Sequence, residues 1–174
     1  MTQRVRVPRT VGKAGGLLGL SIVVYALVGA VWGPLRPALH GTVDHSGSVI
    51  FDMQFNVEFI SFIEYCIIVM VLSIALAIIA FQRLAALRGS AMVWWVTLCA
   101  AVSSLALLLA GQTTANLRYP APKLHQLNQG DHISYVPGFD PTVGIVAAAF
   151  LAALSYWLCV FITPAANSAD SAEV

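Results

Sequence analysis

Four apolar stretches dominate this sequence, and each is long enough to cross a lipid bilayer. They occupy residues 14–35, 59–81, 91–111 and 142–163. The hydrocarbon core of a bilayer is about 30 Å thick, a distance that a helix of about 20 residues covers. Only an α-helix satisfies all the backbone polar groups inside such a segment. The sequence therefore predicts an all-α membrane protein whose four transmembrane helices form a bundle.

The charge content supports this fold class. Only 10% of the residues are charged, whereas a soluble domain carries about 25%. So few charges cannot cover a water-exposed surface, and we expect the lipid bilayer to surround most of the chain. The net charge is +1 and no long basic patch occurs, so no nucleic-acid partner is expected.

The positions of the basic residues predict the orientation in the membrane. Six of the nine lie before the first stretch or between the second and third: Arg4, Arg6, Arg9, Lys13, Arg83 and Arg88. The two longer links hold the other three, Arg36, Arg118 and Lys123. The positive-inside rule then predicts a multi-pass protein of the plasma membrane with both termini in the cytoplasm.

This orientation divides the chain into segments. Residues 1–13 form a basic cytoplasmic N-terminus, residues 14–163 the transmembrane domain, and residues 164–174 a disordered cytoplasmic tail. Residues 36–58 and 112–141 become outer loops. The first stretch could instead be a cleaved signal peptide, but its full spanning length without a polar cleavage region favours a retained helix.

The outer loops contain recognisable local signals. Residues 42–45 and 48–51 are β-prone runs around Ser46-Gly47, which predicts a hairpin. Asp52 is a suitable N-cap for the second helix. Asp140 is a suitable N-cap for the fourth helix, with Pro141 at its first position.

The two loops also resemble each other. Residues 37–52 and 122–140 both contain, in the same order, Pro-x-Leu-His, Asp-His, Ser and Phe-Asp. A duplication would give two tandem helix–loop–helix repeats related by an axis along the membrane normal. Chance similarity between two short loops is the alternative.

All four histidines lie in the outer loops: His40, His45, His125 and His132. Imidazole and carboxylate groups bind zinc or copper, and four histidines near one point could hold a metal ion. Their spacing matches no standard zinc motif, so we expect no metal. The histidines could instead form hydrogen bonds with lipid head groups. A weaker alternative is that their protonation near neutral pH changes how the loops pack.

Glu64 is the only acidic residue inside a predicted span. Carboxylates inside a membrane usually face the bundle interior or water. Glu64 lies about 8 Å below the predicted outer boundary, within reach of a partner such as Arg36 or Gln112. This position favours structural anchoring, with proton or ion handling as the alternative.

Other features concern helix packing. Small residues recur at four-residue spacing, which lets helices approach closely in lipid, either within the bundle or against another membrane protein or a second copy. The pairs are Gly12/Gly16, Gly15/Gly19, Ala26/Ala30, Gly29/Gly33 and Gly144/Ala148.

Interhelical hydrogen bonds are predicted for Ser103, Ser104, Ser155 and Tyr156. Anchoring at the membrane interface is predicted for Trp32, Trp94 and Trp95. Cys66, Cys99 and Cys159 each lie within a predicted span, and we expect them to pack as small apolar residues.

Part of the sequence resembles a known family. The features are a basic start, the run from Tyr25 to Pro37 (YALVGAVWGPLRP), the loop from Leu39 to Val43 (LHGTV), and Phe59 with Phe62 at the second span. They resemble a family of small four-span actinobacterial membrane proteins of unknown function, over residues 20–165. The resemblance implies a plasma-membrane location and transfers no catalytic residues.

No motif for phosphate binding, nucleophilic catalysis or zinc hydrolysis occurs in the sequence. We therefore expect a non-enzymatic protein without a cofactor, acting as an accessory or scaffold subunit of a larger envelope or respiratory membrane complex. One alternative is a small homo-oligomeric transporter or channel that uses Glu64. The other is an outer-face module that binds a metal or ligand through its histidines.

Overall fold

Four long apolar helices form the body of the molecule, as the sequence predicts. The computed structural model describes residues 9–44, 49–51, 56–120 and 131–163. The helices are α1 (Arg9–Trp32), α2 (Val57–Arg83), α3 (Ser90–Arg118) and α4 (Thr142–Ile162). Each is long and apolar enough to cross a membrane. A short 3₁₀ turn, η1 (Gly33–Leu35), extends α1, and a second, η2 (Ala85–Leu87), links α2 to α3.

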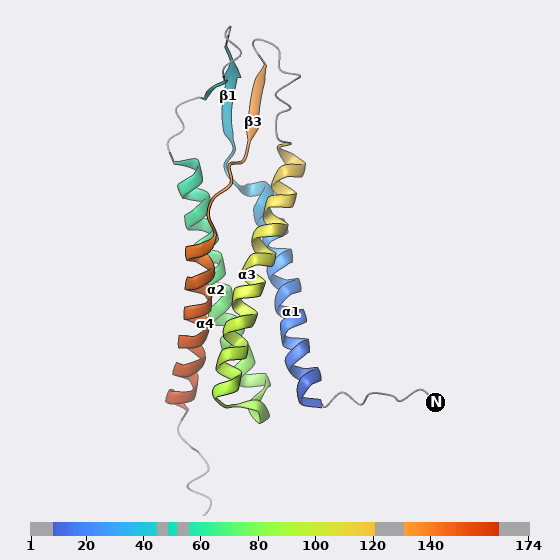
Figure 1. Cartoon of the computed structure of the whole chain (residues 1–174), viewed down its shortest axis with the longest axis vertical. Coiled ribbons are helices and arrows are strands. Elements are labelled where there is room, and N and C mark those ends of the chain that lie inside the picture. Colours follow the sequence, from blue (N-terminus) through green and yellow to red (C-terminus); the bar gives the residue numbers. More distant parts are fainter. Residues whose placement is uncertain (1–8, 45–48, 52–55, 121–130, 164–174) are drawn as a thin grey trace, which may run out of the picture.

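The helices run up and down, with the strands at one end of the bundle (Figure 1). We call this the sheet end; α1 begins and α4 ends at the opposite end. The largest helix contacts are α1 with α3, α2 with α4, and α3 with α4, whereas α1 hardly touches α2. The most buried of the four candidate spans is α3. The bundle is therefore built around α3, which is also the main neighbour of α1.

This packing bears on the predicted duplication. A two-fold axis along the membrane normal would make the α1–α2 contact equivalent to the α3–α4 contact. The second contact is extensive and the first is slight. The two halves are thus not packed equivalently, and the duplication stays a prediction from the loop sequences.

Glycine determines how closely α1 approaches α3. A Cβ atom at Gly29 would collide with the backbone carbonyl of Leu107, and one at Gly33 with that of Gly111. At Gly144 in α4, a Cβ atom would collide with the ring of Tyr65 in α2. In contrast, a Cβ atom at Gly15 would meet nothing within 4 Å, and the same is true of Gly12, Gly16 and Gly19. The Gly29/Gly33 pair therefore serves internal packing, whereas the glycines near the start of α1 do not.

A three-stranded sheet joins the α1–α2 and α3–α4 connections. Its strands are β1 (Leu39–Val43), β2 (Val49–Phe51) and β3 (His132–Tyr135), in the order β2-β1-β3 and all antiparallel. The β1–β2 pair confirms the predicted hairpin, although β1 begins three residues earlier than expected. Pairing between β1 and β3 was not predicted, because it depends on contacts between segments about 90 residues apart. Val43 and Ile133 are buried, whereas His40 and His132 are exposed.

Three local predictions differ from the structure. Helix α3 continues to Arg118, past the predicted end at residue 111, because Gln112–Arg118 contains no helix-breaking residue and Pro120 follows it. Asp52 lies outside the described residues, and the N-cap of α2 is Asn56, in a left-handed conformation. Trp32 is buried rather than anchored in the membrane interface, whereas Trp94 is exposed as expected.

Hydrogen bonds between buried polar side chains tie the helices together. Ser103 of α3 donates to Ser21 of α1 at 2.9 Å, as predicted for an interhelical contact. The hydroxyls of Tyr25 and Ser73 lie 3.1 Å apart and join α1 to α2. The buried hydroxyl of Tyr156 has no hydrogen-bond partner, contrary to its prediction. All three cysteines are free.

The glycine contacts yield a matched test of stability. Gly29→Ala forces a side chain into the Leu107 backbone and should destabilise the fold by about 1–3 kcal/mol, the usual cost of overpacking. Gly15→Ala adds the same methyl group where space is open and should be neutral or slightly stabilising. Thermal unfolding of both variants in one detergent, followed by circular dichroism, measures the difference. Equal transition temperatures would contradict the α1–α3 packing.

Candidate functional site

The structure describes three of the five predicted site residues: Glu64, His40 and His132. His45 and His125 lie outside the described residues. Glu64 is in α2, about two turns below its first residue, whereas His40 and His132 are on the sheet. The carboxylate and the two described histidines therefore belong to different parts of the sheet end.

The two described histidines share one face of the sheet. His40 pairs with Ser134 and Thr42 pairs with His132, so the histidines are diagonal neighbours across β1 and β3. His40 Nδ1 lies 2.8 Å from Ser134 Oγ, a hydrogen bond that orients the imidazole ring. Among the described residues, no group of three or more His, Cys, Asp or Glu side chains is placed to hold a metal ion. The metal-binding hypothesis thus rests on His45 and His125, whose positions the structure does not describe.

Glu64 is held at the sheet end by Trp32 and Arg36. The indole Nε1 of Trp32 donates a hydrogen bond of 3.0 Å to Glu64 Oε2. The guanidinium of Arg36 lies close enough for electrostatic attraction to the same carboxylate. Of the two partners that the sequence suggested for Glu64, Arg36 and Gln112, the structure supports Arg36, and Trp32 was not predicted.

The guanidinium of Arg36 is enclosed by aromatic rings. Arg36 is only 3% exposed, and its Cζ atom lies 5.0 Å from the Trp32 ring centroid and 5.1 Å from that of Phe139. Its Nη2 donates a hydrogen bond of 2.8 Å to the Pro137 carbonyl. Burial lowers the pKa of Arg36, and attraction to Glu64 opposes this shift. An arginine starts from so high a pKa that it stays protonated, so the cluster contains a permanent buried cation.

We call Trp32, Arg36, Glu64, Tyr65 and Phe139 the aromatic–ionic cluster. Besides contacting Arg36, the Phe139 ring lies 5.4 Å from Tyr65 and 6.4 Å from Trp32. The cluster joins the end of α1, the link to β1, the first half of α2 and the segment before α4. Its contacts fix the sheet end of the bundle. Nothing in the spacing of Trp32 and Phe139, more than 100 residues apart, could have predicted that they meet.

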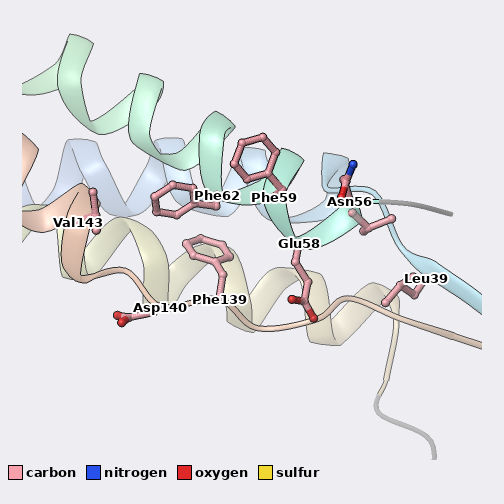
Figure 2. Close-up of a pocket in the computed structure, with 9 residues that line it drawn as sticks. Leu39, Asn56, Glu58, Phe59, Phe62, Phe139, Asp140 and Val143 are labelled. Carbon is pink, nitrogen blue, oxygen red and sulfur yellow. The ribbon is translucent and has the colours of Figure 1, made fainter.

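A pocket of about 570 Å³ lies beside this cluster, where α2 and α4 begin (Figure 2). Its lining combines aromatic, aliphatic and polar side chains: Leu39, Asn56, Val57, Glu58, Phe59, Phe62, Phe139, Asp140 and Val143. The rings of Phe62 and Phe139 meet edge to face at 6.1 Å. The lining contains two carboxylates and no lysine or arginine. The pocket is therefore partly aromatic and negatively charged.

Asp140 lies at the rim of this pocket, next to the start of α4. The N-cap of α4 is Pro141 and Thr142 is the first helical residue, so the predicted cap at Asp140 is one residue too early, although the Asp140 side chain still bonds the first turn. Its Oδ1 accepts hydrogen bonds from the backbone N–H of Thr142 at 2.9 Å and from the Thr142 hydroxyl at 2.6 Å. The side-chain hydrogen bond, followed by the backbone one, lowers the pKa of Asp140. The carboxylate is consequently ionised at neutral pH.

A different surface feature follows the seam between α1 and α2. Two hollows with entirely apolar accessible surfaces, of about 90 Å³ and 410 Å³, follow one another along it. Their lining extends from Leu17 in α1 to Leu35 in η1. On α2, the smaller hollow is lined by residues between Leu72 and Ile79, and the larger one by Ile68 alone. The Tyr25–Ser73 hydrogen bond crosses between the two helices along this seam. The seam exists because the backbone of α1 packs closely on α3 and not on α2, so only side chains bridge α1 and α2.

Comparison with known proteins gives no relative for this chain. No family model, no curated protein and no solved structure matches it. The resemblance to small four-span actinobacterial proteins accordingly stays a prediction. The findings establish an integral membrane protein with four candidate spans.

Arg36→Lys tests the aromatic–ionic cluster. Lysine keeps the charge but lacks the planar group that stacks on Trp32 and Phe139, so the variant should lose about 1–2 kcal/mol of stability. Arg83→Lys, at an exposed position, is the matched control and should leave stability unchanged. Thermal unfolding in detergent measures both. If the two variants unfold at the same temperature, Arg36 does not hold the sheet end together.

Proposed function

We propose that this protein is a non-enzymatic accessory or scaffold subunit of a larger membrane complex, and that a transmembrane helix of its partner lies in the seam between α1 and α2. The single observation that carries the proposal is the pair of apolar hollows along that seam. The expected location is the plasma membrane, with both termini in the cytoplasm and the sheet end outside.

The length of the seam favours a helix over a lipid as its occupant. From Leu17 to Leu35 the seam extends about 27 Å at 1.5 Å per residue. That length is close to the full hydrocarbon thickness of about 30 Å, whereas one lipid tail reaches through only one leaflet. A transmembrane helix covers both halves of the seam at once.

The shape of the seam favours a different chain over a second copy paired through the same surface. A two-fold dimer would bring each surface patch against itself. Two concave seams would then face each other and leave a void, which close packing in lipid disfavours. A single convex helix fills the seam without such a void.

The contacts of Glu64 support an anchoring role more than a transport role. Its carboxylate accepts a hydrogen bond from Trp32 and is electrostatically attracted to the buried guanidinium of Arg36. A carboxylate that carries ions must exchange partners, whereas these contacts hold it in one place. The contacts of Glu64 thus favour the accessory-subunit hypothesis over the transporter hypothesis.

Photo-crosslinking in native membranes tests the partner helix. A photoreactive residue is placed at Leu20 or at Val31, two exposed positions on the two halves of the seam. Both positions should crosslink to the same transmembrane segment of one other protein, identified by peptide mass spectrometry. Ala75→Trp fills the seam and should reduce the yield at both positions about tenfold or more.

The control is a photoreactive residue at Val146, exposed on α4 and away from the seam. It should crosslink mainly to lipid. Crosslinks from Leu20 and Val31 to lipid alone, or to a second copy of this chain, would overturn the proposed partner helix. A crosslinking yield that Ala75→Trp leaves unchanged would also overturn the proposed partner helix.

Cysteine labelling tests the orientation. In a background with all three native cysteines replaced, single cysteines are introduced at His132 in β3 and at Ala85 in the α2–α3 link, both exposed. A membrane-impermeant maleimide added to intact cells should label position 132 and spare position 85, because the basic residues flank the link. Labelling of position 85 alone would show the opposite orientation, with the sheet end in the cytoplasm.

A further inference from the structure

We propose that the pocket between the starts of α2 and α4 binds the ammonium head group of a membrane lipid such as phosphatidylethanolamine. The pocket has room for such a group, with a volume of about 570 Å³. This site is separate from the α1–α2 seam, and the proposal does not depend on the partner helix.

The aromatic part of the pocket suits a cation. Ammonium groups are attracted to the faces of aromatic rings within about 6 Å of the centroid. Phe59, Phe62 and Phe139 contribute three rings to one lining.

The charge of the pocket also selects a cation. Glu58 extends from the first turn of α2 toward the segment that precedes α4, next to Phe139 (Figure 2). Asp140 adds a second negative charge at the rim, with its carboxylate turned away from the rings (Figure 2). The lining contains no basic side chain that could neutralise these carboxylates. Glu58 is therefore the residue placed to pair with an ammonium group.

The position of the pocket indicates that the ligand comes from the bilayer. The pocket is lined by Val57 and Val143, in the first turns of α2 and α4, and both helices are long and apolar enough to cross a membrane. We therefore infer that it lies near the boundary of the hydrocarbon region. Phe59 and Val143 line the pocket and are 58% and 63% exposed, so their apolar surface faces the surrounding lipid. A lipid alongside them would have its acyl chains against these residues and its amine near Glu58.

Lipid retention tests the proposal. The full-length protein is reconstituted in nanodiscs with equal amounts of phosphatidylethanolamine and phosphatidylglycerol of the same acyl chains. After extraction in mild detergent, native mass spectrometry counts the retained lipids. The wild type should retain phosphatidylethanolamine preferentially, and Glu58→Gln should reduce this preference about fivefold, the effect of losing one partly exposed ionic contact.

Asp44→Asn is the matched control, because it removes one carboxylate at the sheet end outside the pocket. It should leave the preference unchanged, and circular dichroism should report the same helix content in all three proteins. Equal retention of the two lipids by the wild type would overturn the proposal, as would an unchanged preference in Glu58→Gln. Displacement of the lipid by free ethanolamine at millimolar concentration would show a soluble ligand and overturn the assignment to a lipid.

Discussion

The close approach of α1 to α3 is the contact on which the arrangement of the bundle depends. Lipid tails are as apolar as the helix surfaces, so burial of apolar side chains alone does not drive helices together in a membrane. Gly29 and Gly33 bring the two backbones close enough for dispersion forces and buried hydroxyl contacts to act. Because α1 packs on α3 in this way, it leaves the seam toward α2 open.

At the sheet end, the aromatic–ionic cluster supplies a second constraint of a different kind. The Arg36 guanidinium is almost completely buried, and a buried charge is costly unless nearby groups compensate it. The Glu64 carboxylate, the Pro137 carbonyl and two aromatic rings provide part of that compensation, while the buried Nε of Arg36 has no hydrogen-bond partner. These groups come from distant parts of the chain, so the cluster also fixes the segment from which Phe139 reaches the pocket between α2 and α4.

Which parts of the structure the sequence could predict depends on how far apart in the chain the interacting residues lie. The four helices and the β1–β2 hairpin depend on residues close in sequence, and the structure confirms them. The start of α4 was predicted one residue too early, with Asp140 rather than Pro141 as its N-cap. The Asn56 cap was missed because the left-handed conformation of an asparagine has no strong local signature. The β1–β3 pairing and the meeting of Trp32 with Phe139 depend on tertiary packing. Similarly, the pocket around Glu58 exists only once α2 and α4 lie side by side, so no sequence motif marks it.

The sheet has a consequence for the order in which the chain matures. Strand β1 pairs with β2 within a short hairpin, but its other edge pairs with β3, where His40 and Ser134 are 94 residues apart. During synthesis from the N-terminus, that edge must stay without its final partner until α2, α3 and the second long connection have been made. An unpaired strand edge readily joins other chains. Completion of the second half of the protein thus protects the first half against misassembly.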